Sequence, residues 1–140
     1  MILLDTNVLS ELMRPVPDAQ VVAWLDKQDA NSVTISAITV AEILYGIERL
    51  PDGKRKRGFA ARAAAMFEED FSGRILSFDS EAAVLYAEQV AVSESTGRQV
   101  HMVDAQIAAI CIQHGAVLAT RNIKDFETLS VETINPWEMS

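Results

Sequence analysis

Four acidic residues and one asparagine stand where they could meet at one edge of a folded sheet. Asp5 ends the first short apolar run of the chain, and Glu42 lies one turn into the helical pattern after the second. Asp104 begins a later helical pattern, and Asn122 and Asp125 follow the apolar run behind it. Ligands of open α/β sheets gather outside the carboxyl ends of the strands. We therefore expect a functional site at that edge.

A cluster of carboxylates suits a hard cation. Two carboxylates about 4 Å apart repel by roughly 4 kcal/mol at an effective dielectric near 20, so three together need protons or a cation. Mg2+ and Mn2+ bind oxygen ligands and keep waters for chemistry. The pattern thus favours a metal site.

Each acidic residue also has a structural interpretation. Asp5 could cap the helix that follows it, and Glu42 could complete a capping box by bonding back to the Thr39 backbone. For Glu42, spacing favours the cap. Asp104 could be a first-turn acid stabilised by the helix dipole, and Asp125 an ordinary turn residue. For Asp5, Asp104 and Asp125, spacing alone leaves open whether the side chain binds a metal or is structural.

Other chemistry-bearing residues are expected to be structural. Asp79 follows a strand but precedes Ser80 and a helical pattern, which predicts an N-cap. Cys111 lies on an apolar helical stripe and is expected in the core. His101 and His114 have no partner motif, and His114 next to Gly115 fits the end of a helix.

Strand-like and helical patterns alternate along the chain. Short apolar or β-branched runs predict strands at 2–4, 33–36, 74–78 and 116–120, with a candidate fifth at 131–134. Helical patterns occur at 8–13, 18–25, 38–50, 59–71, 80–93 and 103–115, and the basic run 54–57 is expected in an exposed turn. In the 38–50 helix, Leu44 and Tyr45 are expected on the apolar side. The alternation predicts an α/β fold with a mainly parallel sheet covered on both faces.

Composition limits the function classes. The 140 residues, 49% of them hydrophobic, suit one domain spanning 1–140. Twelve basic against 20 acidic residues give a net charge of −8, which argues against a broad basic surface for duplex DNA or anionic membrane. Five of the twelve basic residues lie within 54–62, where they could guide RNA or form a solvated loop.

Targeting and redox signals are lacking. The chain has one cysteine, no apolar run long enough to span a bilayer and no signal-peptide pattern at its start. We therefore expect a soluble, cytoplasmic protein that does not bind membranes.

Four segments resemble the motifs of PIN-domain ribonucleases. In chain order they are LLDTN at 3–7, AEILYG at 41–46, DAQIAA at 104–109 and TRNIKDF at 120–126. More narrowly, the chain is similar to VapC toxins of bacterial type II toxin–antitoxin systems, and INPW at 134–137 is similar to the FitB-like branch. The resemblance spans essentially the whole chain. It implies a PIN-like three-layer sandwich, with about five mainly parallel strands and helices on both faces.

The resemblance also implies an Mg2+- or Mn2+-dependent endoribonuclease that cleaves single-stranded RNA. Asp5, Glu42 and Asp104 match the three main acidic positions and would be the metal ligands. The fourth position departs from the pattern, because Asn122 stands where many relatives have aspartate. Asparagine offers only a neutral carbonyl, so Asp125 is the alternative fourth acid.

In the implied reaction, water attacks the phosphate in line and leaves a 3′-hydroxyl and a 5′-phosphate. Thr6 and Thr120 are candidate hydroxyl donors to the phosphate or to a water. The implied partners are an RNA substrate, a cognate antitoxin that covers the pocket or a nearby groove, and a second toxin subunit in a homodimer.

Three other functions compete with this one. A PIN-like module without catalysis could dock a partner, although a binding surface has no need for a costly carboxylate cluster. A structure-specific DNA nuclease could use the same chemistry. A phosphatase of the haloacid dehalogenase type needs a second Asp two residues after the first, and Asn7 stands there.

Overall fold

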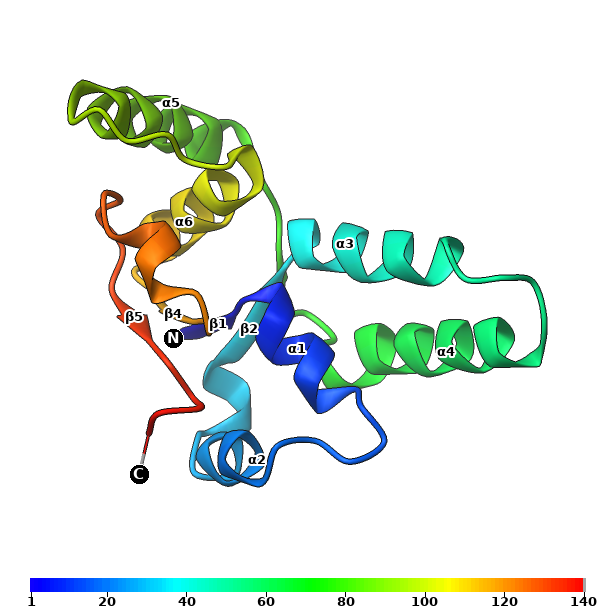
Figure 1. The fold of residues 1–140 in the computed structure, drawn as a ribbon. Coiled ribbons are helices and arrows are strands. Elements are labelled where there is room, and N and C mark those ends of the chain that lie inside the picture. Colours follow the sequence, from blue (N-terminus) through cyan, green and yellow to red (C-terminus); the bar gives the residue numbers. More distant parts are fainter. Residues whose placement is uncertain (140) are drawn as a thin grey trace.

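The computed structural model describes residues 1–139, which form a three-layer α/β arrangement around a five-stranded sheet (Figure 1). The strand order is β3-β2-β1-β4-β5, and all four pairings are parallel. The strands are β1 (Ile2–Leu4), β2 (Val33–Ser36), β3 (Ile75–Leu76), β4 (Val117–Ala119) and β5 (Thr133–Ile134). The predicted parallel sheet and its fifth strand are confirmed.

Helices link the strands within the described residues. The α-helices are α1 (Thr6–Leu12), α2 (Ala19–Asp26), α3 (Ala37–Glu48), α4 (Lys54–Ala65), α5 (Ser80–Ser95) and α6 (Met102–His114). Shorter turns are η1 (Ala30–Ser32), the π-helical η2 (Met66–Asp70) and η3 (Ile123–Phe126). Of the helices in residues 1–139, none combines the length and apolar character of a membrane span.

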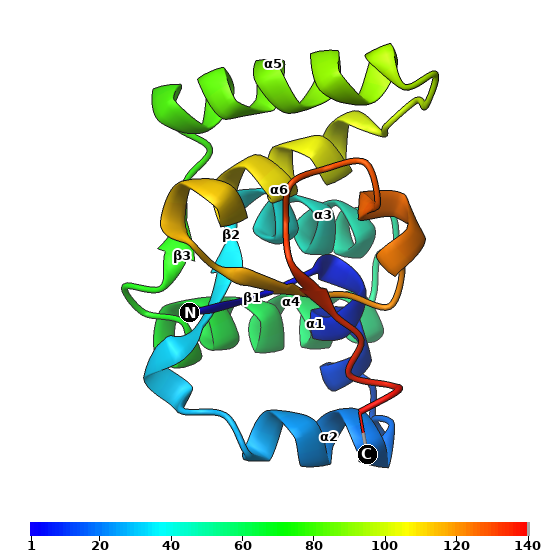
Figure 2. The same cartoon turned by 90° about the vertical axis from the view of Figure 1, so that its left-hand side faces the viewer.

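The sheet separates two apolar cores. Successive side chains of a strand point to opposite faces. Leu4 and Ala119 therefore pack with α1 to α4, whereas Leu3 and Leu118 pack with α5, α6 and Phe126 on the other face. Figure 2 shows α5 and α6 above the sheet and α1, α2 and α4 below it. This confirms the predicted helices on both faces.

The basic run at 54–57 is not the exposed turn that its composition predicted. It forms the first turn of α4, which begins at Lys54 directly after the N-cap Gly53. Lys56 Nζ donates to the Glu48 carbonyl oxygen at 3.0 Å and to Asp52 Oδ1 at 3.3 Å. These acceptors offset a positive charge that the amino end of a helix disfavours.

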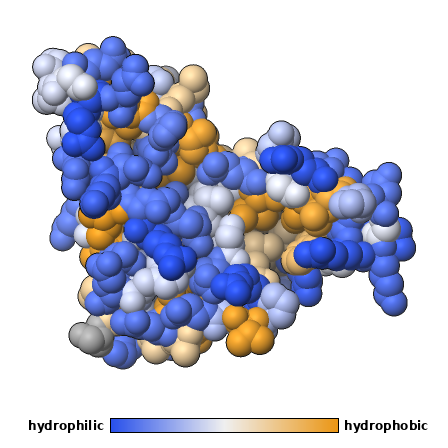
Figure 3. Space-filling model, in the orientation of Figure 1, coloured by the Kyte–Doolittle hydropathy of each residue, from blue (hydrophilic) through white to orange (hydrophobic). Residues whose placement is uncertain are grey.

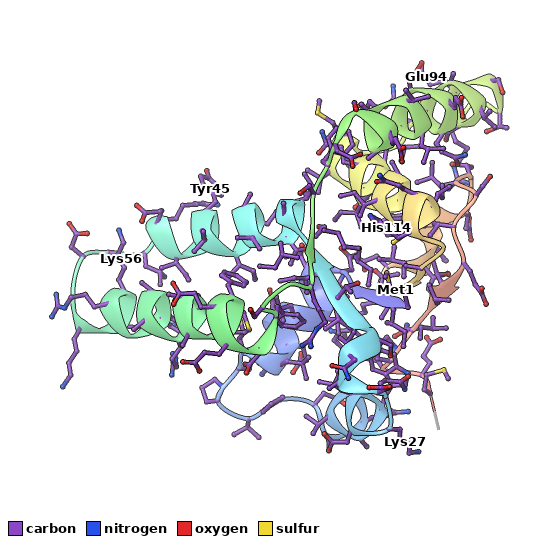
Figure 4. All side chains as sticks on the ribbon, turned by 180° about the vertical axis from the view of Figure 1, so that it is seen from behind. Met1, Lys27, Tyr45, Lys56, Glu94 and His114 are labelled. Atoms are coloured by element: carbon purple, nitrogen blue, oxygen red, sulfur yellow. The ribbon has the colours of Figure 1, made fainter. Side chains whose placement is uncertain are left out.

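The apolar side predicted for α3 is also partly wrong. The helix buries Thr39, Ile43 and Ile47, whereas Leu44 and Tyr45 are 43% and 64% exposed. Figure 4 shows Tyr45 on the side of α3 that faces away from α4. The helix packs against α4 as an antiparallel pair (Figure 1), so its buried stripe is set by that neighbour.

Candidate active site

Asp5 lies at the carboxyl edge of the sheet between two neighbouring strand ends. The register pairs Leu3 with Thr34 and Leu4 with Ala119, so Asp5 is level with Ser36 on one side and Thr120 on the other. Its backbone N–H donates to the Ala119 carbonyl at 2.9 Å. The parallel pairing, rather than sequence proximity, brings these positions together.

The Asp5 carboxylate is buried and held by three donors. Oδ1 accepts from the Thr6 backbone N–H at 2.9 Å, and Oδ2 accepts from Thr120 Oγ1 at 2.8 Å and from Asn7 Nδ2 at 3.3 Å. Burial nonetheless raises the pKa of Asp5 above its usual value, and the charge of Glu42 adds to this. Asp5 therefore caps α1, as spacing allowed, and also presents a desolvated carboxylate.

Glu42 does not belong to a capping box, so that interpretation is wrong. The N-cap of α3 is Ser36, whose Oγ accepts from the Thr39 backbone N–H at 3.1 Å. Thr39 lies inside the helix and is fully buried. The exposed Glu42 instead accepts a hydrogen bond from Thr6 Oγ1 at 2.6 Å through its Oε1 atom. Because Thr6 directly follows Asp5, this contact holds Glu42 close to the Asp5 position.

Asp104 lies in the first turn of α6 and is partly buried. Burial and then the charges of Asp5 and Asp125 raise its pKa to about 6, with a smaller contribution from Glu42. His101 acts in the opposite direction. The charges of Asp5, Asp125 and Glu42 therefore act on Asp104, which agrees with the expectation that these side chains lie at the same edge of the sheet.

Asn122 and Asp125 lie in the turn after β4. The Asn122 backbone N–H donates to Thr120 Oγ1 at 3.1 Å, and its carbonyl accepts from the Asp125 N–H at 3.0 Å. Both side chains are exposed. Asp125 contributes a charge that Asp104 senses, whereas Asn122 is neutral.

Asn7 and Thr39 were not predicted as site residues, but each contacts a residue that was. Asn7 joins two strand ends, because its Nδ2 donates to Asp5 and its Oδ1 accepts from the Arg121 backbone N–H at 3.1 Å. Thr39 contacts Thr6 Oγ1 at 2.9 Å. The signal for Asn7 was its place in the LLDTN segment. The signal for Thr39 was its position one helical turn before Glu42.

The carboxylate oxygens of these side chains are donors of the kind that a hard divalent cation binds. In this structure, however, no three acidic, histidine or cysteine side chains among residues 1–139 are placed so that together they could hold a metal ion. Across the same residues, the ion pairs are Arg14–Glu11, Lys56–Asp52 and Arg98–Glu127, so no lysine or arginine neutralises the gathered acids. Negative charge and oxygen donors without a protein counter-ion are what Mg2+ or Mn2+ requires.

The residues predicted to be structural lie in helix caps, in the core or at a helix end. Asp79 caps α5 by accepting from the Ala82 N–H at 3.0 Å, which holds its pKa below the usual value. Cys111 is fully buried, and desolvation raises its pKa to about 12. Gly115 ends α6 in the left-handed conformation with φ of 64°, directly after His114.

A groove of about 400 Å³ runs from the site between α1, α3 and α4. Thr6 and Glu42 line it beside apolar side chains and two arginines, Arg14 and Arg55. Figure 3 shows apolar surface exposed between α3 and α4. The apolar and basic lining consists of Met13, Arg14, Pro15, Ile43, Ile47, Leu50, Arg55 and Phe59.

The parallel α/β sheet with acidic residues after its strands is that of a PIN domain, and the match to a family model shows this class. The family model described as PIN domain matches residues 2–131.

Full-length relatives narrow the assignment. VapC ribonuclease Y4jK of Sinorhizobium fredii is 41% identical over 99% of both chains. Toxin FitB of Neisseria gonorrhoeae is 42% identical over 98% of this chain and 99% of its own. A solved structure of FitAcB from N. gonorrhoeae is similar with a TM-score of 0.94 at 42% identity, covering 99% of this chain and 100% of that chain. A solved toxin–antitoxin complex from Klebsiella pneumoniae is similar with a TM-score of 0.71 at 25% identity, covering 99% of this chain and 100% of that chain. The chain belongs to the PIN-domain family and, within it, to the VapC ribonuclease toxins.

Proposed function

We propose that the chain cleaves single-stranded RNA with Mg2+ or Mn2+ as the toxin of a toxin–antitoxin pair. The observation that carries this proposal is the buried Asp5 carboxylate, whose pKa is raised by burial and by the charge of Glu42, and whose own charge raises the pKa of Asp104. Among the described residues, no lysine or arginine forms an ion pair with these acids. Burying such charge is costly unless a cation offsets it. Binding of a catalytic cation would offset this cost, whereas a surface that only docks a partner would not need a buried carboxylate.

Asp5, Glu42 and Asp104 would hold the cation, with Asp125 as the fourth acid. A bound Mg2+ or Mn2+ supplies positive charge for the scissile phosphate and lowers the pKa of a water toward neutrality. The protein's own part is positioning: Asp5 is fixed by its three donors, and Glu42 by Thr6. Water attacks the phosphorus in line, and the product strands end in a 3′-hydroxyl and a 5′-phosphate.

Thr6 and Thr120 act on the carboxylates rather than on the phosphate in this proposal. Each hydroxyl can donate one hydrogen bond, and in the structure Thr6 donates to Glu42 and Thr120 donates to Asp5. Both are therefore positioning residues. This role differs from the one expected from the sequence, in which the two hydroxyls donate to the phosphate or to a water.

The decisive experiment is cleavage of a fluorescent single-stranded RNA by the chain purified without antitoxin. We expect cleavage with Mn2+ or Mg2+ and none in EDTA, and a loss of a hundredfold or more in Asp5→Asn and Asp104→Asn, which is about 2.7 kcal/mol of activation free energy. Cleavage that persists in EDTA refutes the metal mechanism.

The same assay separates the competing functions. Matched DNA hairpins and flaps, incubated under the same conditions, test for a structure-specific DNA nuclease. Failure to cut any of these substrates despite Mn2+ binding supports a binding module. RNA cleavage with intact DNA supports the proposed ribonuclease.

The groove between α1, α3 and α4 suits the antitoxin. Its apolar floor would take hydrophobic side chains, while Arg14 and Arg55 would attract acidic ones. Arg62 and Arg55 lie over the Phe59 ring at 4.6 and 5.6 Å, which fixes that anchor. We expect Phe59→Asp to stop co-purification of the product of an adjacent small open reading frame, whereas Ala23→Asp on the exposed side of α2 should not.

A second copy of the chain is the other proposed partner. Exposed apolar side chains on α3 and α5 support it: Leu44, Tyr45, Val84 and Val92 are between 43% and 64% exposed. Light scattering of the purified chain should give a dimer mass. A monomer at micromolar concentration contradicts this part of the proposal.

A further inference from the structure

A chain of hydroxyl groups leads from the start of α3 to the Glu42 carboxylate. Ser36 Oγ donates to Thr39 Oγ1 at 3.4 Å, Thr39 Oγ1 lies 2.9 Å from Thr6 Oγ1, and Thr6 Oγ1 donates to Glu42 Oε1 at 2.6 Å. Three elements contribute: the end of β2, the interior of α3 and the first residue of α1. The series of hydroxyls therefore connects the end of β2 to the start of α1 through side chains alone.

The hydrogen bonds along this series of hydroxyls can be donated in one direction only. A hydroxyl carries a single proton, and an ionised carboxylate can only accept. Since Thr6 donates its one hydrogen bond to Glu42, Thr39 must be the donor in the bond between Thr39 and Thr6. Thr39 in turn accepts from Ser36. Each bond thus polarises the next, and the series ends on the charged Glu42.

Thr39 and Ser36 are the two fully buried members of this series of hydroxyls. Neither has exposed surface, so water cannot replace their bonds, whereas Thr6 is partly exposed. Thr6 also ties the site together, because its backbone N–H donates to Asp5 while its hydroxyl holds Glu42. The orientation of the Thr6 hydroxyl consequently depends on the donor behind it.

We infer that Thr39 is a positioning residue, which fixes the Thr6 hydroxyl and through it the direction in which Glu42 presents its carboxylate to a divalent cation. This rests on the proposed metal-dependent function. Removing the Thr39 hydroxyl would leave Thr6 free to rotate and Glu42 free to turn toward solvent. Partners behind a metal ligand commonly tune metal affinity in this way.

The test is Mn2+ binding, measured by electron paramagnetic resonance of free Mn2+ and by the rise in melting temperature that Mn2+ produces. Thr39→Val keeps the side-chain shape and removes the hydroxyl. We expect it to weaken Mn2+ binding about fivefold, the value of one typical hydrogen bond. Thr39→Ser restores the hydroxyl and should bind within about twofold of the parent. Thr39→Ala is the substitute if the valine variant does not fold, with the same expectation.

Thr34→Val is the matched control. Thr34 is likewise a buried threonine, but its Oγ1 donates to the Ile2 carbonyl at 2.8 Å, away from Glu42. Its loss should lower stability without changing Mn2+ affinity. Parent-like Mn2+ binding by Thr39→Val, or equal weakening in Thr34→Val, overturns the role of Thr39. Failure of the parent itself to bind Mn2+ instead refutes the proposed metal site, and the role of Thr39 with it.

Discussion

Replacing Asp104 with asparagine should stabilise the metal-free protein at neutral pH, although it removes a proposed metal ligand. The pKa of Asp104 is raised from 3.8 to about 6 by burial and by the charges of Asp5 and Asp125. At 1.36 kcal/mol per pKa unit this corresponds to about 3 kcal/mol, which solvent screening of a partly exposed group reduces to about 1–2 kcal/mol. Losing a negative charge in the first turn of α6 costs about 0.5 kcal/mol.

The net gain of about 1 kcal/mol should raise the melting temperature by about 3–4 °C in a chain of this size. Thermal melts in EDTA at pH 7.5 measure it directly. Because the folded-state pKa is raised, the parent loses stability as the pH rises from about 4 to about 6, and below that range the carboxyl is neutral in both states. The advantage of Asp104→Asn should therefore be complete above about pH 6.5 and absent near pH 4.

Adding Mn2+ should reverse the order of the two proteins. A cation that binds only the folded state adds about 2.7 kcal/mol at a hundredfold excess over its Kd, and the variant should gain much less. Asp79→Asn is the matched control, since Asp79 is an exposed helix cap outside the site. It should show neither the gain in EDTA nor a smaller response to Mn2+. A variant that is less stable than the parent in EDTA at pH 7.5, or that gains as much from Mn2+, would refute the reasoning about Asp104.

Three further predictions concern neighbouring residues. Asp125→Asn should raise the Mn2+ concentration that gives half-maximal cleavage and Asn122→Asp should lower it; the opposite result would make Asp125 a plain turn residue. Thr120→Val removes a donor from the buried Asp5 carboxylate, so chemical denaturation at pH 7 should show a loss of about 1–3 kcal/mol that shrinks as acid protonates Asp5; a loss that is constant with pH would argue against the interaction. Cys111, buried and with its pKa raised to about 12, should react with a thiol reagent only after unfolding; rapid reaction of the native protein would show that α6 opens.

Local pattern was sufficient for the order of elements and for several caps. Short apolar runs broken by helical patterns can bury their surface only as a covered parallel sheet, which is the sheet observed. Asp79 caps the helix that its position predicted, because a cap bond reaches only two or three residues along the chain. The candidate acids followed from the same logic, since they come directly after strands or at helix starts.

What sequence could not decide depends on contacts between distant segments. Spacing favoured Thr39 as the cap partner of Glu42, but Ser36 takes that role and frees Glu42 for Thr6, 36 residues away. Tyr45 was expected on the apolar side of α3, but α4 packs on the other side.

Both outcomes have one physical cause. Composition and periodicity report which side chains favour burial or a cap, whereas the partner that each one meets is fixed by strand register and by how helices pack on the sheet. Local sequence therefore predicted a parallel α/β fold and the acids that follow its strands. The contacts of Thr6 with Glu42 and of Thr120 with Asp5 follow only from the fold, because each hydroxyl reaches its carboxylate from a segment distant in sequence.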